Sequence, residues 1–247
     1  MIFHLVVFLA SVLAGAVAAI SGFGIGSLFT PLLAARYGTK LAVALVSIPH
    51  LVATAARLVR LREHVDKRVF INFGILSAAG GLLGALLNLR ANSPVLSIVF
   101  GCLLLFAGIS GLTRMADRMR FGRRMAWTAG ALSGFFGGLV GNQGGIRSAA
   151  LLGFEIPKES LVATATAVAL IVDGARTPVY LAIETQQILN AWGLLLLMIP
   201  GVLLGTWWGV RLLRRIPDRM FRPLLDSLIL RLGVYMLLHA IKLQRHQ

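Results

Sequence analysis

The chain has 247 residues, of which 57% are hydrophobic and 13% charged, with a mean hydropathy of +0.84. This composition excludes an ordinary soluble domain, because too little polar surface is available to coat so many apolar side chains. The net charge of +15 is carried by arginines concentrated between hydrophobic segments. That pattern is typical of the cytoplasmic loops of a membrane protein and not of a nucleic-acid-binding surface.

Ten apolar segments follow one another along the chain. They predict helices at 2–20, 25–35, 41–59, 69–88, 94–112, 125–140, 145–154, 160–182, 188–210 and 222–241. The first lacks a basic n-region, so we expect it to be retained in the membrane and not removed as a secretory signal. The single cysteine, Cys102, excludes disulfides and thiolate metal sites within one chain.

Two of these segments, 25–35 and 145–154, are too short to span a bilayer, which takes about 20 residues. Each follows a glycine-rich break. The breaks are Gly22-Phe23-Gly24-Ile25-Gly26-Ser27 and Gly141-Asn142-Gln143-Gly144-Gly145-Ile146-Arg147-Ser148. Irregular backbone at membrane depth is tolerated only where it is buried in protein or lines a wet cavity. We therefore expect each short segment to pair with the one before it as a broken or re-entrant hairpin.

Loop charges predict the topology. Three basic stretches, 60–68, 114–124 and 211–222, are expected at the cytoplasmic face, and the stretch around Glu184 is expected outside. The number of membrane crossings brings the stretch 211–222 to the cytoplasmic face only if the chain reverses at the second break. The predicted fold is an all-α membrane protein with two inverted repeats, 1–124 and 125–247. Each repeat is a broken or re-entrant hairpin plus three transmembrane helices, an arrangement associated with alternating access.

Matching positions support the duplication. Lys40 matches Lys158 at an offset of 118 residues. Three polar pairs match at an offset of 119: Ser47 with Thr166, Thr54 with Asp173, and Arg57 with Arg176. With His50, they form polar stripes on two otherwise apolar helices, because their spacings of three, four and seven residues place them on one helical face.

Charged side chains at mid-bilayer cost at least ~2.5–3.5 kcal/mol on insertion scales, so they mark a pathway or an ion pair. Asp173 and Arg176 could simply neutralise each other, three residues apart. Arg57 could snorkel toward the basic loop. His50 is equally compatible with a proton carrier and with a structural, hydrogen-bonded histidine.

The second break favours anion chemistry. A helix that begins after Gly144-Gly145 directs free N–H groups at the cavity. Arg147 adds a fork of donors suited to an oxoanion, and Asn142 and Gln143 add neutral donors and acceptors. The alternative is that the glycines only allow close helix packing, which we expect for Gly80-Gly81, Gly84 and Gly137-Gly138.

Taken in order, these motifs resemble those of the sulfite exporter TauE/SafE family of membrane permeases. In the first half the resemblance is carried by Gly22-Phe23-Gly24-Ile25-Gly26, Pro31-Leu32-Leu33 and Ala44-Leu45-Val46-Ser47. In the second half it is carried by 130–138, Gly144-Gly145, Leu152-Gly153 and 158–166. The glycine triplet usual in the family is reduced to Gly26-Ser27 and becomes Asn142-Gln143-Gly144-Gly145 in the second half, and Ala149 replaces a usual proline. The resemblance implies export or uptake of sulfite, sulfonates or related organosulfur anions.

We therefore expect a secondary transporter in a bacterial-type inner (plasma) membrane, with membrane lipids and a small anion as partners. The residues expected to bind the anion are Gly24, Gly26, Ser27, Ser47, Asn142, Gln143, Gly144, Gly145, Arg147, Thr166 and Arg176. Those expected to couple transport to an ion, with protons as the candidate, are His50, Arg57 and Asp173. No cofactor, metal or nucleic acid is expected, and a homo-oligomer is left open.

Two other functions remain open from the sequence. The chain could be an intramembrane enzyme acting on a lipid phosphate, for which Ser47 with His50 is the candidate pair of nucleophile and base. It could also be a passive anion channel.

Overall fold

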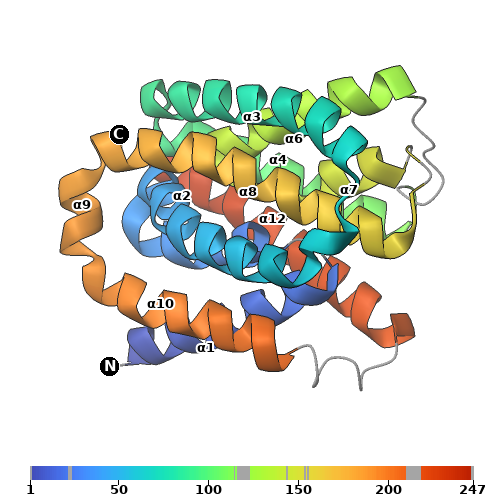
Figure 1. Ribbon diagram of the computed structural model, residues 1–247. Helices are drawn as coiled ribbons and strands as arrows, with labels where there is room; N and C mark the ends of the chain where they lie inside the picture. The colour runs from blue at the N-terminus through green and yellow to red at the C-terminus, as the bar shows by residue number, and fades with distance from the viewer. Residues whose placement is uncertain are drawn as a thin grey trace.

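The protein is helical throughout the part that its computed structural model describes, which comprises residues 2–21, 24–113, 115, 123–142, 144–152, 154, 156–209 and 218–245. Figure 1 shows the helices as a bundle whose long members run side by side. Six helices in this part are long and apolar enough to cross a membrane: Ile2–Ile20, Ile25–His64, Lys67–Arg90, Ser93–Leu112, Glu159–Ile183 and Pro223–Lys242. The all-helical membrane fold predicted from the sequence is therefore confirmed.

The first half of the chain forms four long helices. They are α1 (Ile2–Ser21), α2 (Ile25–Leu61), α3 (Lys67–Arg90) and α4 (Ser93–Leu112), with a short 3₁₀ turn, η1 (Arg62–His64), after α2. The side chains of Asp66 and Asn92 accept hydrogen bonds from the first free N–H groups of α3 and α4, which explains why these helices begin there. The separately predicted segments 25–35 and 41–59 are one kinked element. Gly38 adopts a φ of 73° within it, a left-handed value that suits glycine.

The second half is divided into more and mostly shorter elements. It contains α6 (Arg123–Val140), α7 (Gly144–Leu152), α8 (Lys158–Ile183), α9 (Thr185–Asn190), α10 (Trp192–Leu204), η2 (Gly205–Gly209) and α12 (Asp218–Arg245). The helix predicted at 188–210 is divided, because the chain turns at Ala191 between α9 and α10. The other predicted helices agree with the observed bounds to within a few residues.

Helices from the two halves interlock through glycines. A Cβ atom added to Gly80 or Gly84 of α3 would collide with backbone carbonyls of α6. Equivalent collisions would occur between α1 and α10, for example at Gly15 against Val202. Contact at the backbone is what small residues provide in membranes, where there is little hydrophobic gain from bringing two helices together. The packing role predicted for Gly80-Gly81 and Gly84, and for Gly138 on the α6 side, is confirmed.

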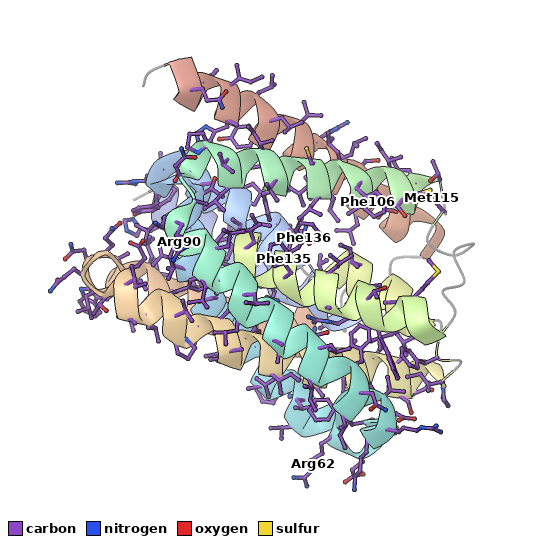
Figure 2. The ribbon with its side chains drawn as sticks, turned by 90° about the horizontal axis from the view of Figure 1, so that it is seen from above. Arg62, Arg90, Phe106, Met115, Phe135 and Phe136 are labelled. Atoms are coloured by element: carbon purple, nitrogen blue, oxygen red, sulfur yellow. The ribbon has the colours of Figure 1, made fainter. Side chains whose placement is uncertain are left out.

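The two ends of the bundle carry different segments. In Figure 1, α9 lies at the left end of the bundle. At the right end, α2 is followed by α3, α6 and α12 begin, and α10 with η2 ends. In Figure 2, Arg62 and Arg90 mark opposite ends of α3. Of the three predicted basic stretches, 60–68 lies at the right end, whereas residues 114, 116–122 and 210–217 of the other two lie outside the described part of the chain. The sidedness that the loop charges predict stays a prediction.

The centre of the bundle is formed by α2 and α8, which pack against each other. The faces that they turn inward carry the polar stripes, and Ser47, Thr54, Thr166 and Asp173 are all buried. Apolar side chains on the outside of α1, α3, α4 and α12 are exposed, as expected for helices that face lipid. The packing of α3 on α6 and of α1 on α10 is what two inverted repeats would produce, and the repeat itself remains a prediction.

Replacing Gly84 by alanine is expected to destabilise the protein by about 1–3 kcal/mol, because the new methyl group must separate α3 from the backbone of α6. Thermal unfolding in detergent measures the change. Gly193 is the matched control, since it lies in α10 with nothing within 4 Å of an added Cβ. Alanine is the better helix former, so Gly193→Ala should be neutral or stabilising. Equal unfolding temperatures for the two variants would contradict the backbone contact.

Candidate functional site

The two glycine-rich breaks lie against each other at the centre of the bundle. Gly24 and Gly141 adopt φ values of 126° and 77°, so the helices stop there instead of continuing. A Cβ atom on Gly26 would collide with the carbonyl oxygen of Gly141, and the hydroxyl of Ser27 donates to Oδ1 of Asn142 at 3.3 Å. The tips of the two hairpins are therefore in direct contact, as expected for one site built from both halves.

Not every predicted residue of the breaks can be placed. Gly22, Phe23 and Gln143 lie outside the described residues. Gly144 and Gly145 are the first two residues of α7, so the helix begins slightly earlier than the start predicted after this pair. Gly144 is half-buried, and its N–H belongs to the helix end that carries a partial positive charge.

Beside the tips lies a buried group of ionisable side chains, which we call the charge cluster: His50, Arg57, Arg147, Asp173 and Arg176. All five belonged to the predicted site. Asp173 is fully enclosed, and the guanidinium groups of Arg147 and Arg176 belong to residues only 3% and 1% exposed. Charged groups this deeply buried are retained only with close partners or a function.

Asp173 is shared by two partners. Its Oδ2 lies 2.5 Å from Nδ1 of His50, and its Oδ1 accepts a hydrogen bond of 2.9 Å from Nε of Arg176. The hydroxyl of Thr54 lies 3.4 Å from the same ring nitrogen of His50. The mutual neutralisation of Asp173 and Arg176 considered from the sequence is therefore present. The histidine from the other half of the chain joins it.

Arg57 and Arg176 perform the same task in the two halves. Arg57 donates through its NH1 to the carbonyl of Ala18 in α1, and Arg176 donates through its NH1 to the carbonyl of Gly137 in α6 at 2.6 Å. Donors and acceptors are both related by the 119-residue offset, and each arginine is 39 residues from its acceptor. These carbonyls belong to the last turns before the breaks, and that of Gly137 also accepts a hydrogen bond of 3.0 Å from the N–H of Gly141. The snorkelling alternative for Arg57 is wrong, because its side chain is buried against α1.

The end of α6 is held by two further side chains that sequence reasoning missed. Tyr180 donates to the carbonyl of Gly138, and Nδ2 of Asn88 donates to the carbonyl of Leu139 at 2.7 Å. With Gly137, three successive carbonyls accept side-chain hydrogen bonds at the second tip. A signal for Asn88 existed, since it is a polar residue in the apolar 69–88 segment. Tyr180 gave none, because tyrosine is common near helix ends in membranes.

Arg147 reaches the cluster from α7. Its NH1 lies 3.5 Å from the carbonyl oxygen of Ala165 in α8, and it interacts electrostatically with Asp173, Arg176 and Arg57. The structure therefore brings Arg147 and Arg176 into one region, which the hypothesis of a single site requires. Leu28 stands at the position that corresponds to Arg147 in the first half.

Hydroxyl groups near the tips differ in what they bind. Ser47 and Thr166 are buried, but each donates within its own helix, to Ala44 and Val162, both at 2.7 Å. Thr30 is different. It is fully buried near Gly141, and its hydroxyl has no hydrogen-bond partner among the described residues. Sequence reasoning missed Thr30, because a threonine in an apolar helix usually bonds back to its own backbone.

The cluster has an excess of positive charge. Even when Arg147 is set aside, two guanidinium groups, of Arg57 and Arg176, share the carboxylate of Asp173. Arginine keeps its charge in proteins, so the excess cannot be relieved by loss of a proton. A small anion would relieve it. Among the described residues, no group of three His, Cys, Asp or Glu side chains is placed to hold a metal.

A sequence profile of the family described as Sulfite exporter TauE/SafE matches residues 7–236. The chain belongs to this family. The match runs from α1 into α12, so it includes both breaks and every residue of the charge cluster. TauE/SafE proteins are permeases for sulfite and related anions, and the chain is a multi-pass integral membrane protein. Neither a curated protein nor a solved structure matches it.

Removing the Tyr180 hydroxyl is expected to loosen the second tip of this TauE/SafE protein. In Tyr180→Phe the carbonyl of Gly138 loses its side-chain donor, which should cost about 1 kcal/mol. The loss appears as a lower unfolding temperature in detergent and as faster amide hydrogen exchange around 137–141. Tyr235→Phe is the control, because that ring is 40% exposed and stacks on His239. Unchanged exchange around the second tip in Tyr180→Phe would show that this hydrogen bond does not hold it.

Proposed function

We propose that the protein is a secondary transporter of a small oxoanion, sulfite or an organic sulfonate, which binds between the two tips beside the charge cluster. The observation that carries the proposal is the excess of buried positive charge at the place where the breaks meet. Family membership supports the substrate class. The structure supports the position of the site.

The buried positive charge of the cluster favours an anionic substrate. Burying an ion without compensation is costly, and the cost falls when an opposite charge binds close by. An anion between the tips would lie near Arg176 and within reach of the potential of Arg57 and Arg147. Such an anion is stabilised by charges that are already in place and need no reorganisation. This favours a charged substrate over a neutral one.

The donors suit an oxoanion in particular. Arg147 offers a planar fork of N–H groups that matches two oxygens of a sulfite or sulfonate group. The first turn of α7 offers backbone N–H groups and a partial positive charge. Thr30 and the pair formed by Ser27 and Asn142 offer neutral donors from both halves. Together these groups would supply both charged and neutral donors to an anion bound at the tips.

The contact between the tips supports alternating access. Because Gly26 lies on the carbonyl of Gly141, an anion can pass only when the tips separate. We propose that the repeats, 1–124 and 125–247, move relative to each other and open the site to one end at a time. A hollow of about 240 Å³ lined by Tyr37, Leu41, Gln187, Asn190 and Ala191 would serve as the entrance near α9.

The enzyme alternative gains no support from the geometry. The hydroxyl of Ser47 donates to Ala44, and no hydrogen bond joins Ser47 to His50 among the described residues, so the candidate nucleophile is not paired with the candidate base. A passive channel differs from a carrier in its kinetics, and the transport assay distinguishes the two.

Replacing Arg147 by glutamine is expected to lower kcat/KM for sulfite uptake into proteoliposomes by about tenfold to a hundredfold. The range corresponds to the loss of one charge-assisted hydrogen bond. Uptake of labelled sulfite and of a labelled sulfonate is measured against concentration. Arg90→Gln is the matched control, because Arg90 is exposed at the end of α3 (Figure 2) and should transport like the wild type.

Equal flux through wild type and Arg147→Gln would remove Arg147 from the site. Flux that fails to saturate, with no acceleration by anion on the opposite side, would replace the carrier with a channel. Absence of flux for every sulfur oxoanion tested would overturn the proposed function.

Replacing Thr30 by valine is expected to raise KM for the anion by about tenfold while the unfolding temperature stays the same. Stability is retained because the hydroxyl has no partner to lose among the described residues, and valine has the same shape. Thr30→Ser keeps the hydroxyl and should restore the affinity. If Thr30→Val is destabilised with KM unchanged, the hydroxyl has a structural role and does not contact the anion.

A further inference from the structure

His50 and Asp173 break the symmetry that otherwise relates the two halves. At the 119-residue offset His50 corresponds to Ala169, and Asp173 corresponds to Thr54. By contrast, Arg57 and Arg176 occur in both halves and make equivalent hydrogen bonds. A pair needed only to close the fold should recur with the duplication. This pair occurs once, where one substrate site is expected.

The two partners differ in accessibility. The side chain of Asp173 is fully enclosed, whereas that of His50 keeps 10% of its surface accessible. Asp173 already has a permanent cationic partner in Arg176, so neutralising the carboxylate does not require a charged histidine. His50 is therefore free to gain and lose a proton without leaving Asp173 unpaired.

We propose that His50, held in place by Asp173, binds the proton that is transported together with the anion. The neutral ring donates its Nδ1–H to Asp173, and the transported proton is added to Nε2. The resulting imidazolium remains paired with the carboxylate, and Nε2 returns the proton to water on the other side of the membrane. The inference rests on the proposed function, because it presumes an anion at the neighbouring tips.

Electrostatic interaction couples the binding of the proton to the binding of the anion. Asp173, the carboxylate in contact with His50, also interacts electrostatically with Arg57 from the helix of His50, with Arg147 from α7 and with Arg176 from α8. In the empty site the arginines oppose another positive charge on the ring. A bound anion offsets that positive charge, so the anion and the proton favour each other's binding. By reciprocity, a protonated ring strengthens anion binding by the same factor.

The path between the sites is short and continuous. His50 contacts Asp173, Asp173 binds Arg176, and Arg176 binds Gly137 at the base of the second tip. The anion and the proton therefore both act on the side chains of His50, Asp173 and Arg176. Coupling through such a physical network is expected to be strong enough to alter affinity several-fold.

The test uses an anion that carries no proton of its own near neutral pH, namely methanesulfonate, with sulfate as a second probe. Purified full-length protein in weakly buffered detergent is mixed with the anion, and a pH indicator reports proton uptake. Affinity is measured by thermal stabilisation at pH 6 and pH 8. We expect up to about one proton taken up per anion bound, and affinity about tenfold tighter at pH 6.

The variant His50→Gln should abolish both the proton uptake and the pH dependence of affinity. His64→Gln is the matched control, because His64 is exposed in η1, and it should retain both. In proteoliposomes loaded with a pH dye, the ratio of protons to anions transported is also measured. This ratio does not depend on the amount of active protein. If gel filtration shows that His50→Gln does not fold, His50→Asn takes its place, and proton uptake by the wild type still tests the inference.

The outcomes separate this inference from the proposed function. Anion binding by the wild type without proton uptake, or equal uptake by wild type and His50→Gln, overturns the inference and leaves the transporter intact. No binding of methanesulfonate, sulfate or sulfite, together with no flux, overturns the proposed function itself.

Discussion

Breaking a helix inside a membrane exposes backbone groups that no water can satisfy, and the rest of this structure depends on how that problem is solved. Each break ends a helix, and carbonyls of its last turn accept hydrogen bonds from side chains of the neighbouring helices. Arg57 supplies a donor to Ala18 at the first break, and Arg176 supplies one to Gly137 at the second. The charges that the membrane makes expensive are thus used to permit the irregular backbone that a binding site needs.

An arginine is suited to this double task because its guanidinium group has five N–H donors in a fixed plane. Arg176 bonds Asp173 and Gly137 at once. A lysine has a compact ammonium group and could not bridge the two partners with the same geometry. The structural role and the proposed ligand-binding role therefore coincide in Arg57 and Arg176. Arg147 and Thr30, which do not cap a helix that ends at a break, report on the ligand more cleanly.

Much of the fold could be predicted from the sequence, because hydropathy and loop charge act strongly in a membrane. The segments, the breaks and the meeting of Arg147 with Arg176 followed from pattern and parity. The partners of the polar groups did not follow. Nothing in the sequence indicates that Asn88 and Tyr180 bond the end of α6, since those contacts depend on how α3 and α8 lie across the second tip. The continuous kinked α2 was also missed, because Gly38 alone does not reveal that helix resumes on both sides of it.

The halves are alike where backbone must be satisfied and unlike where a ligand would bind. The arginine caps and the glycine contacts recur in both halves, because each hairpin poses the same physical problem. Arg147, His50 and Asp173 have no ionisable counterparts, being matched by Leu28, Ala169 and Thr54. Two related halves are expected to keep matching residues only where both halves have the same role. Different side chains around the tips are therefore expected when one asymmetric anion, and one proton, bind between two related halves.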